Sequence, residues 1–244
     1  MRCKALICDV LSRDFYYYSS LSDNIVDIEL MDSYNHLYPK KMKESIQKKI
    51  DSVDSSKYDY ILMGFGLCGN ALNGIQTNDI KIVVPKVHDC ITLFIGSKRK
   101  YKEYFEESPN SMYYISSWIE KNGMNQEMQD LKSIGLGESY EYYEQKYGEK
   151  GAKYLSQIAN EWIKRYNKAV YVTNKLVKED YSHEVMNISK KRQWNFEEIK
   201  GNSYMVENLI NGYWNEDDFL VVEKNSRIYS TGDDNIVDFE YVQS

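Results

Sequence analysis

The first half of the chain alternates short apolar runs with segments of helical periodicity. Met42, Ile46 and Ile50 recur with the spacing of one helix face, and a second helix is predicted to begin near Cys90. Apolar, strand-like runs occupy residues 3–11, 25–33, 58–66 and 79–87. Because strands that alternate with helices form parallel sheets, this half is predicted to be an α/β layer.

The same rhythm returns towards the C-terminus. Strands are predicted at residues 169–176, 194–201 and 217–228, and helices at residues 137–167, 181–193 and 202–212. The predicted fold class is therefore α/β, with mostly parallel sheets flanked by helices in two Rossmann-like lobes joined by a helical segment. The predicted divisions are an N-terminal α/β lobe at residues 1–115, a helical linker segment at 116–167 and a C-terminal α/β lobe at 168–244.

Charge and hydropathy exclude several functional classes. The net charge is −6 and no block of lysine and arginine occurs, so nucleic-acid binding is not expected. No apolar run approaches the roughly 18 residues that a membrane helix needs, and the apolar stretch at the N-terminus is too short for a signal peptide. Four cysteines without a secretory signal indicate the reducing cytoplasm. The sequence does not indicate an oligomeric state.

A glycine-rich loop follows the third predicted strand. Gly64, Gly66 and Gly69 permit close approach of the backbone to another group. Ligands bind beyond the carboxyl ends of the strands in open α/β sheets. The candidate cofactor-binding residues are therefore Gly64, Gly66, Gly69 and Asn70. The loop has the spacing GxGxxG, but no helical pattern follows it, so a dinucleotide is not favoured.

Three of the four cysteines lie at predicted strand ends, and two of them are near a histidine or a glycine loop. The candidate metal ligands are Cys8, Cys68, His88 and Cys90. Thiolate sulfur and imidazole nitrogen suit zinc or an iron–sulfur cluster. There is no CxxC pair, so the alternative that the cysteines are small buried hydrophobic residues stays open.

Two further hypotheses use the same residues without a metal. In one, Cys90 or Cys68 is a catalytic nucleophile and His88 is its base, with Cys90 activated at a helix N-terminus. Asp89 would then orient His88, although an N-cap for the following helix is the preferred role of Asp89. In the other, the chain is a non-catalytic accessory protein that binds a small ligand.

Several segments together resemble an uncharacterised prokaryotic family that is known as a domain of unknown function. The segments are residues 8–14 (CDVLSRD), 36–39 (HLYP), 64–70 (GFGLCGN), 84–101 (VPKVHDCITLFIGSKRKY), 194–201 and 209–228. The resemblance covers nearly the whole chain. Members occur in anaerobic bacteria and methanogens, often near genes of corrinoid-dependent methyltransferases.

The resemblance implies a metal or cofactor site and an interaction with a corrinoid or a corrinoid methyltransferase system. The family pattern falls on Cys8, His36, Gly66, Cys68, Gly69, Asn70, His88, Asp89 and Cys90. One departure is Asp14, where the pattern has a glutamate, and this leaves a role for that position open. The leading hypothesis is a cytoplasmic metal- or cofactor-binding protein with a Cys/His site at the sheet edge, linked to one-carbon methyl transfer.

Overall fold

The computed structural model describes residues 1–33 and 38–242, and the chain forms two compact units. Unit 1 consists of Met1–Tyr101 and Gly201–Ser244, and unit 2 of Lys102–Lys200. The predicted boundaries after residues 115 and 167 differ from this division. The reason is that the C-terminal segment pairs with the first sheet, so the first unit is discontinuous in sequence.

Unit 1 is built on one five-stranded sheet. Its elements are β1 (Arg2–Cys8), a 3-10 turn (Asp9–Leu11), α1 (Ser12–Leu21), β2 (Ile25–Met31), α2 (Pro39–Asp51), β3 (Tyr60–Gly64), β4 (Lys81–Pro85), α3 (Cys90–Ile95), α9 (Tyr204–Asn211), β8 (Phe219–Val222), β9 (Ser226–Ser230) and β10 (Val237–Tyr241). The strand order is β2-β1-β3-β4-β8, and β9 and β10 form a separate antiparallel pair. The first four strands are parallel and β8 is antiparallel to β4.

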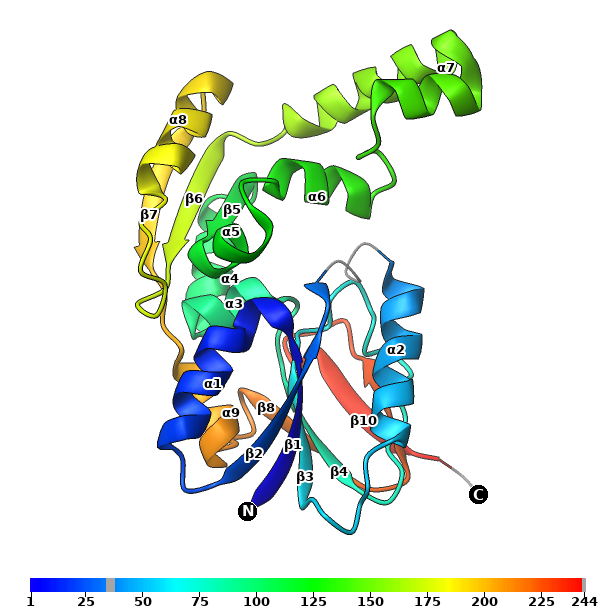
Figure 1. Cartoon of the computed structure of the whole chain (residues 1–244), viewed down its shortest axis with the longest axis vertical. Helices are drawn as coiled ribbons and strands as arrows, with labels where there is room; N and C mark the ends of the chain where they lie inside the picture. The colour runs from blue at the N-terminus through cyan, green and yellow to red at the C-terminus, as the bar shows by residue number, and fades with distance from the viewer. Residues whose placement is uncertain (34–37, 243–244) are drawn as a thin grey trace. The chain divides into compact units, whose positions relative to one another are not determined.

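Helices cover both faces of this sheet. Figure 1 shows α1 and α9 on one side of the sheet and α2 on the other. The sequences of the central strands are nearly continuous apolar runs, because both faces of these strands are buried. Leu6, Leu62 and Val83, one from each central strand, have no exposed surface. The register places Ala5 of β1 between Ile28 and Leu62.

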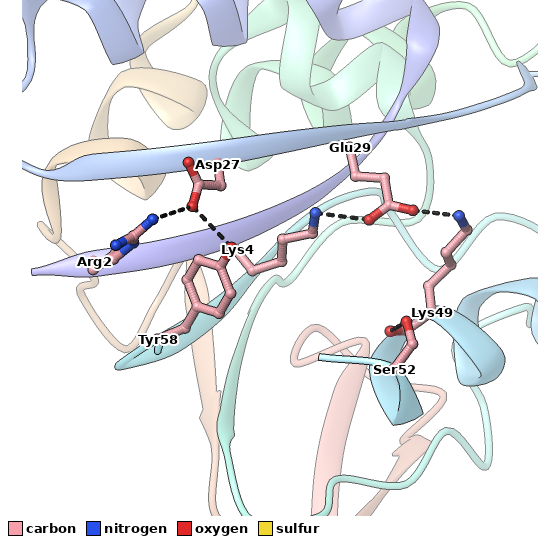
Figure 2. Close-up of polar contacts among 7 residues, drawn as sticks. All are labelled: Arg2, Lys4, Asp27, Glu29, Lys49, Ser52 and Tyr58. Atoms are coloured by element: carbon pink, nitrogen blue, oxygen red, sulfur yellow. Dashed lines mark hydrogen bonds and ion pairs between the residues drawn. The ribbon is translucent and has the colours of Figure 1, made fainter. Parts of the chain in front are cut away.

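A network of charged side chains joins α2 to the two strands at one edge of the sheet (Figure 2). Glu29 of β2 accepts from Lys4 of β1 at 2.7 Å and from Lys49 of α2. These two hydrogen bonds hold the pKa of Glu29 below its usual value. Two residues before Glu29 on β2, Asp27 accepts a hydrogen bond from Arg2 at 3.0 Å and another from the Tyr58 hydroxyl at 2.8 Å.

Unit 2 contains a three-stranded parallel sheet in the order β5-β6-β7. The elements that follow α3 are α4 (Lys98–Glu107), β5 (Ser111–Ile115), α5 (Ser116–Asn122), α6 (Gln126–Ser133), α7 (Tyr140–Ile163), β6 (Lys168–Thr173), α8 (Ser182–Arg192) and β7 (Asn195–Lys200). The core of this unit consists of Met112, Tyr114, Ile119, Ala169, Tyr171 and Val185. The predicted α/β class with mostly parallel, helix-flanked sheets is thus confirmed.

Two predicted elements are divided in the structure. The helix expected from Cys90 ends at Ile95, because Gly96 has a positive φ of 77° and α4 starts only at Lys98. A Cβ at Gly96 would lie 2.2 Å from the carbonyl oxygen of Asn202, so this position requires glycine. The strand expected over residues 217–228 is likewise two strands, β8 and β9, separated by a turn.

Candidate functional site

The predicted site segments meet at the carboxyl edge of the sheet in unit 1. β1, β3 and β4 are neighbouring parallel strands, so the chain leaves all three at the same edge. β1 lies between β2 and β3 in the sheet. The connection from β1 therefore leads to the strand on one side of it, β2, and the connection from β2 leads to the strand on the other side, β3. The carboxyl ends of β1 and β3 therefore form a topological switch point, where open α/β sheets bind ligands.

The end of β1 brings one thiol and two carboxylates to this edge. Cys8 is 1% exposed, and burial raises the pKa of its thiol to about 12. Asp9 is buried and accepts a hydrogen bond from the Ser33 amide at 3.1 Å. Asp14, on the first turn of α1, is buried and accepts from the Ser203 hydroxyl at 2.5 Å.

The glycine loop after β3 is packed tightly against the segment after β4. A Cβ at Gly66 would lie 2.6 Å from the backbone nitrogen of Asp89. The next two amides, those of Leu67 and Cys68, each donate to a carbonyl of that segment at 2.8 Å, namely those of Val87 and His88. The predicted close backbone approach is thus present at Gly66, where the neighbour is the chain itself.

Three consecutive residues of this loop have left-handed backbone conformations. The φ angles are 46° at Cys68, 64° at Gly69 and 69° at Asn70. A positive φ is uncommon for cysteine, and strain of this kind costs on the order of 1 kcal/mol. Gly69 and Asn70 are exposed, whereas Cys68 is buried. The run turns the chain sharply at the switch point.

The segment after β4 positions Asp89 as a helix cap, which confirms the preferred prediction for this residue. Its carboxylate accepts from the amides of Ile91 and Thr92 at 3.0 and 3.4 Å and from the Tyr101 hydroxyl at 3.1 Å. Burial raises the pKa of the Asp89 carboxyl, and these hydrogen bonds oppose that shift. Cys90, the first residue of α3, is 3% exposed.

The thiols are arranged unlike a metal centre. The pKa of the Cys68 thiol is also raised, mainly by burial. Cys8 lies close enough to Cys68 to add to this shift by electrostatic repulsion. In residues 1–33 and 38–242, no three His, Cys, Asp or Glu side chains are grouped so that they could hold a metal ion. The zinc or iron–sulfur site of Cys8, Cys68, His88 and Cys90 therefore has no such grouping behind it in this part of the chain and stays a prediction. His36 lies outside the described residues.

The predicted catalytic pair of Cys90 and His88 also lacks the expected geometry. His88 is exposed, and its ring makes no hydrogen bond to any residue within the described ranges. A base that activates a thiol holds a hydrogen bond to it, or to a water between them, in the reacting complex, so the catalytic pair stays a prediction. Burial, moreover, opposes the thiolate form of Cys8 and Cys68.

Sequence reasoning missed the buried carboxylate of Asp9 and the partner of Asp14. Asp9 follows directly on an apolar run, which is a signal that could have identified it as a buried polar residue at a strand end. Ser203 could not have been found in this way, because it lies 189 residues from Asp14 in the sequence.

No helix in the described part of the chain is both long and apolar enough to cross a membrane. A family model described as "Protein of unknown function (DUF1638)" matches residues 30–210. The match includes the glycine loop and the His88–Cys90 segment, whereas Cys8 and the segment after residue 210 lie outside it. Comparison with curated proteins and with solved structures finds no match.

Proposed function

Since the chain belongs to the family described as "Protein of unknown function (DUF1638)", we propose a function from its own geometry: it binds a small organic ligand or cofactor at the carboxyl edge of the sheet in unit 1. In this proposal, the loops after β1 and β3 form the site, and the chain acts as a binding or accessory protein. The corrinoid link implied by the resemblance makes a corrinoid the first candidate ligand, and a cytoplasmic location belongs to the same proposal.

The observation that carries this proposal is the switch point between β1 and β3. Cys8 ends β1, and Cys68 follows β3 in the left-handed run of residues 68–70. Strained backbone at a switch point is typical of ligand sites, since the surrounding structure must hold it in place. The buried carboxylates of Asp9 and Asp14 at the same edge favour a neutral or cationic ligand surface over a phosphate.

Two features make binding a better account than thiol catalysis. Burial raises the pKa of Cys68, one of the two predicted nucleophiles, so its thiol is neutral at physiological pH. His88, the predicted base, is exposed and makes no hydrogen bond through its ring within the described ranges. The exposed imidazole of His88 therefore offers a nitrogen at this edge, and nitrogen is a good ligand for the cobalt of a corrinoid.

The experiment measures ligand binding by the full chain and by matched cysteine variants. Protein is purified without oxygen, native mass spectrometry detects any co-purifying molecule, and equilibrium dialysis measures the binding of hydroxocobalamin. Cys8→Ala and Cys68→Ala are expected to lower the affinity at least about tenfold, because both side chains lie at the switch point. Cys3→Ala is the control, because Cys3 is an equally buried thiol at the amino end of β1.

The outcomes separate the site from the ligand. A co-purifying molecule that is lost in Cys8→Ala and Cys68→Ala but kept in Cys3→Ala supports the site, even when hydroxocobalamin does not bind. In that case only the corrinoid link fails. Absence of both a co-purifying molecule and hydroxocobalamin binding, or equal affinity in all three variants, refutes the proposed function.

A further inference from the structure

A second pocket lies at the opposite, amino edge of the sheet in unit 1. It is open, has a volume of about 480 Å³ and is lined by Tyr204, Asn208, Tyr213, Trp214 and Asn215. The residues come from α9 and from the turn that leads to β8. Trp214 packs edge-to-face against Tyr60, the first residue of β3, with ring centroids 4.7 Å apart. The pocket is therefore separate from the switch point, which lies beyond the other end of β3.

Asn208 presents an amide without a partner to this pocket. The residue is 7% exposed, yet its side-chain amide makes no hydrogen bond to any of the described residues. The Asn208 amide is not sealed from solvent, so its donor and acceptor reach the open pocket and are available to a ligand. The other lining amide is already used, since Asn215 donates to the Asp218 carboxylate at 3.0 Å.

Aromatic rings surround this amide. The indole of Trp214 is fixed, because its Nε1 donates to the carbonyl of Leu209 at 2.8 Å. Tyr204 lies one helical turn before Asn208 on the same face of α9, and 51% of it is exposed. Tyr213 is 68% exposed. Large exposed rings that line the same pocket as this amide provide surfaces on which a planar ligand can stack.

We propose that this pocket binds a nucleobase or nucleoside, with the Asn208 amide on the hydrogen-bonding edge of the base and the aromatic side chains on its faces. An asparagine amide offers one donor and one acceptor in a plane, which matches adenine in a bidentate pair. Stacking of bases on aromatic side chains tolerates any base, because every base has a π-face.

The same observations disfavour the nearest alternatives. A sugar would need several polar groups for its hydroxyls, whereas Asn208 is the lining amide that is free within the described residues. The five lining residues include no lysine, arginine or histidine, so a phosphate group gains nothing there. A nucleoside therefore fits better than a nucleotide or a monosaccharide.

Isothermal titration calorimetry of the full chain with adenosine tests this site, with AMP and glucose as comparison ligands. Adenosine is expected to bind saturably, AMP no more tightly than adenosine, and glucose not at all. Asn208→Leu is expected to weaken adenosine binding about tenfold or more, since a bidentate pair is lost. Tyr213→Ala is expected to weaken it about fivefold or more through lost stacking. Asn211→Leu, a change on the same helix outside the lining set, serves as the matched control and keeps full affinity.

Circular dichroism establishes whether each variant is folded. If Asn208→Leu does not fold, the adenosine affinity of Tyr213→Ala decides the outcome. Three results would overturn the proposal: no saturable adenosine binding, glucose binding in its place, or adenosine affinity unchanged in both pocket variants. None of these results bears on the carboxyl edge, because the cysteine variants above leave this pocket intact.

Discussion

Replacement of Gly66 by alanine is expected to loosen the carboxyl edge of unit 1. The added Cβ would lie 2.6 Å from the backbone nitrogen of Asp89 and 2.7 Å from its Cα. Ordinary contact begins at 3.4 Å, so the two segments must separate by 0.8 Å, the difference between those distances. Both contacts are to backbone, so no side chain can rotate out of the way.

This separation weakens the hydrogen bonds that hold the glycine loop. The bonds from Leu67 and Cys68 to the carbonyls of Val87 and His88 are 2.8 Å long. A shift of this size takes both bonds beyond the usual hydrogen-bond range, at a cost of about 1 kcal/mol each. Together with overpacking of about 1–3 kcal/mol, the free energy of unfolding is expected to fall by about 3–5 kcal/mol.

Urea denaturation followed by circular dichroism measures the loss, and amide hydrogen exchange at Leu67 and Cys68 locates it. Gly232→Ala is the matched control in the same unit. Gly232, unlike Gly66, has a positive φ of 73°, but nothing lies within 4 Å of an added Cβ, so the loss at Gly232 is limited to about 1 kcal/mol. If Gly66→Ala is no more destabilising than Gly232→Ala, or if exchange at the two amides is unchanged, the close approach does not constrain this edge.

Two further predictions concern charge and thiol chemistry. Glu29→Gln is expected to lower the free energy of unfolding by about 0.5–1 kcal/mol at pH 7, since Glu29 loses its charged bonds to Lys4 and Lys49. Because these bonds lower the pKa of Glu29 in the folded chain, the stabilisation is present above the usual pKa of a glutamate and is lost as the pH falls through the lowered pKa. Urea titrations that give the same difference in unfolding free energy between the wild type and Glu29→Gln at pH 7 and at pH 3 would contradict this. Burial raises the pKa of Cys3 to about 11 and of Cys8 to about 12, so iodoacetamide is expected to label both slowly at pH 8, at rates that still rise at pH 10. Mass spectrometry that finds either thiol labelled as fast as free cysteine would show that the thiol is accessible and activated.

The strands that carry the candidate site could be predicted because they are buried on both faces. β1, β3 and β4 therefore appear in the sequence as nearly continuous apolar runs. α1 was missed, since its segment SRDFYYYSSL buries only three side chains and has little apolar periodicity. The pairing of β8 with β4 was missed as well, because it joins segments about 137 residues apart, and local patterns contain no information on such contacts.

The helix at residues 137–167 shows how one backbone conformation alters a predicted face. The spacing of Tyr143, Tyr147 and Tyr154 predicts that they share one apolar helix face, but Tyr143 is buried whereas 54% of Tyr147 and 65% of Tyr154 are exposed. Gly148 has φ of 73° and ψ of 171°, which interrupts α7 and changes the rotational phase after it. Ser139, which was not assigned as a cap, accepts from the Tyr142 amide at 3.2 Å and starts the helix.

For the candidate site, the sequence places Cys8, the glycine loop and Cys90 after predicted parallel strands, but their shared edge depends on the order of those strands, which the structure provides. Their chemistry did not follow, because it depends on burial. Neither the raised pKa of Cys8 nor the exposure of His88 is visible in the spacing of the residues. The contact of Ser203 with Asp14 depends on the return of the chain from unit 2.

The discontinuity of unit 1 determines the order in which a nascent chain can complete its parts. The ribosome synthesises all of unit 2 before residues 201–244, which contribute α9, β8 and the hairpin of β9 and β10. Until then β4 has an open edge, and the face that α9 will cover remains exposed to water. Unit 2, which is continuous, is therefore free to fold first during translation, whereas unit 1 cannot be completed before residues 201–244 have been synthesised.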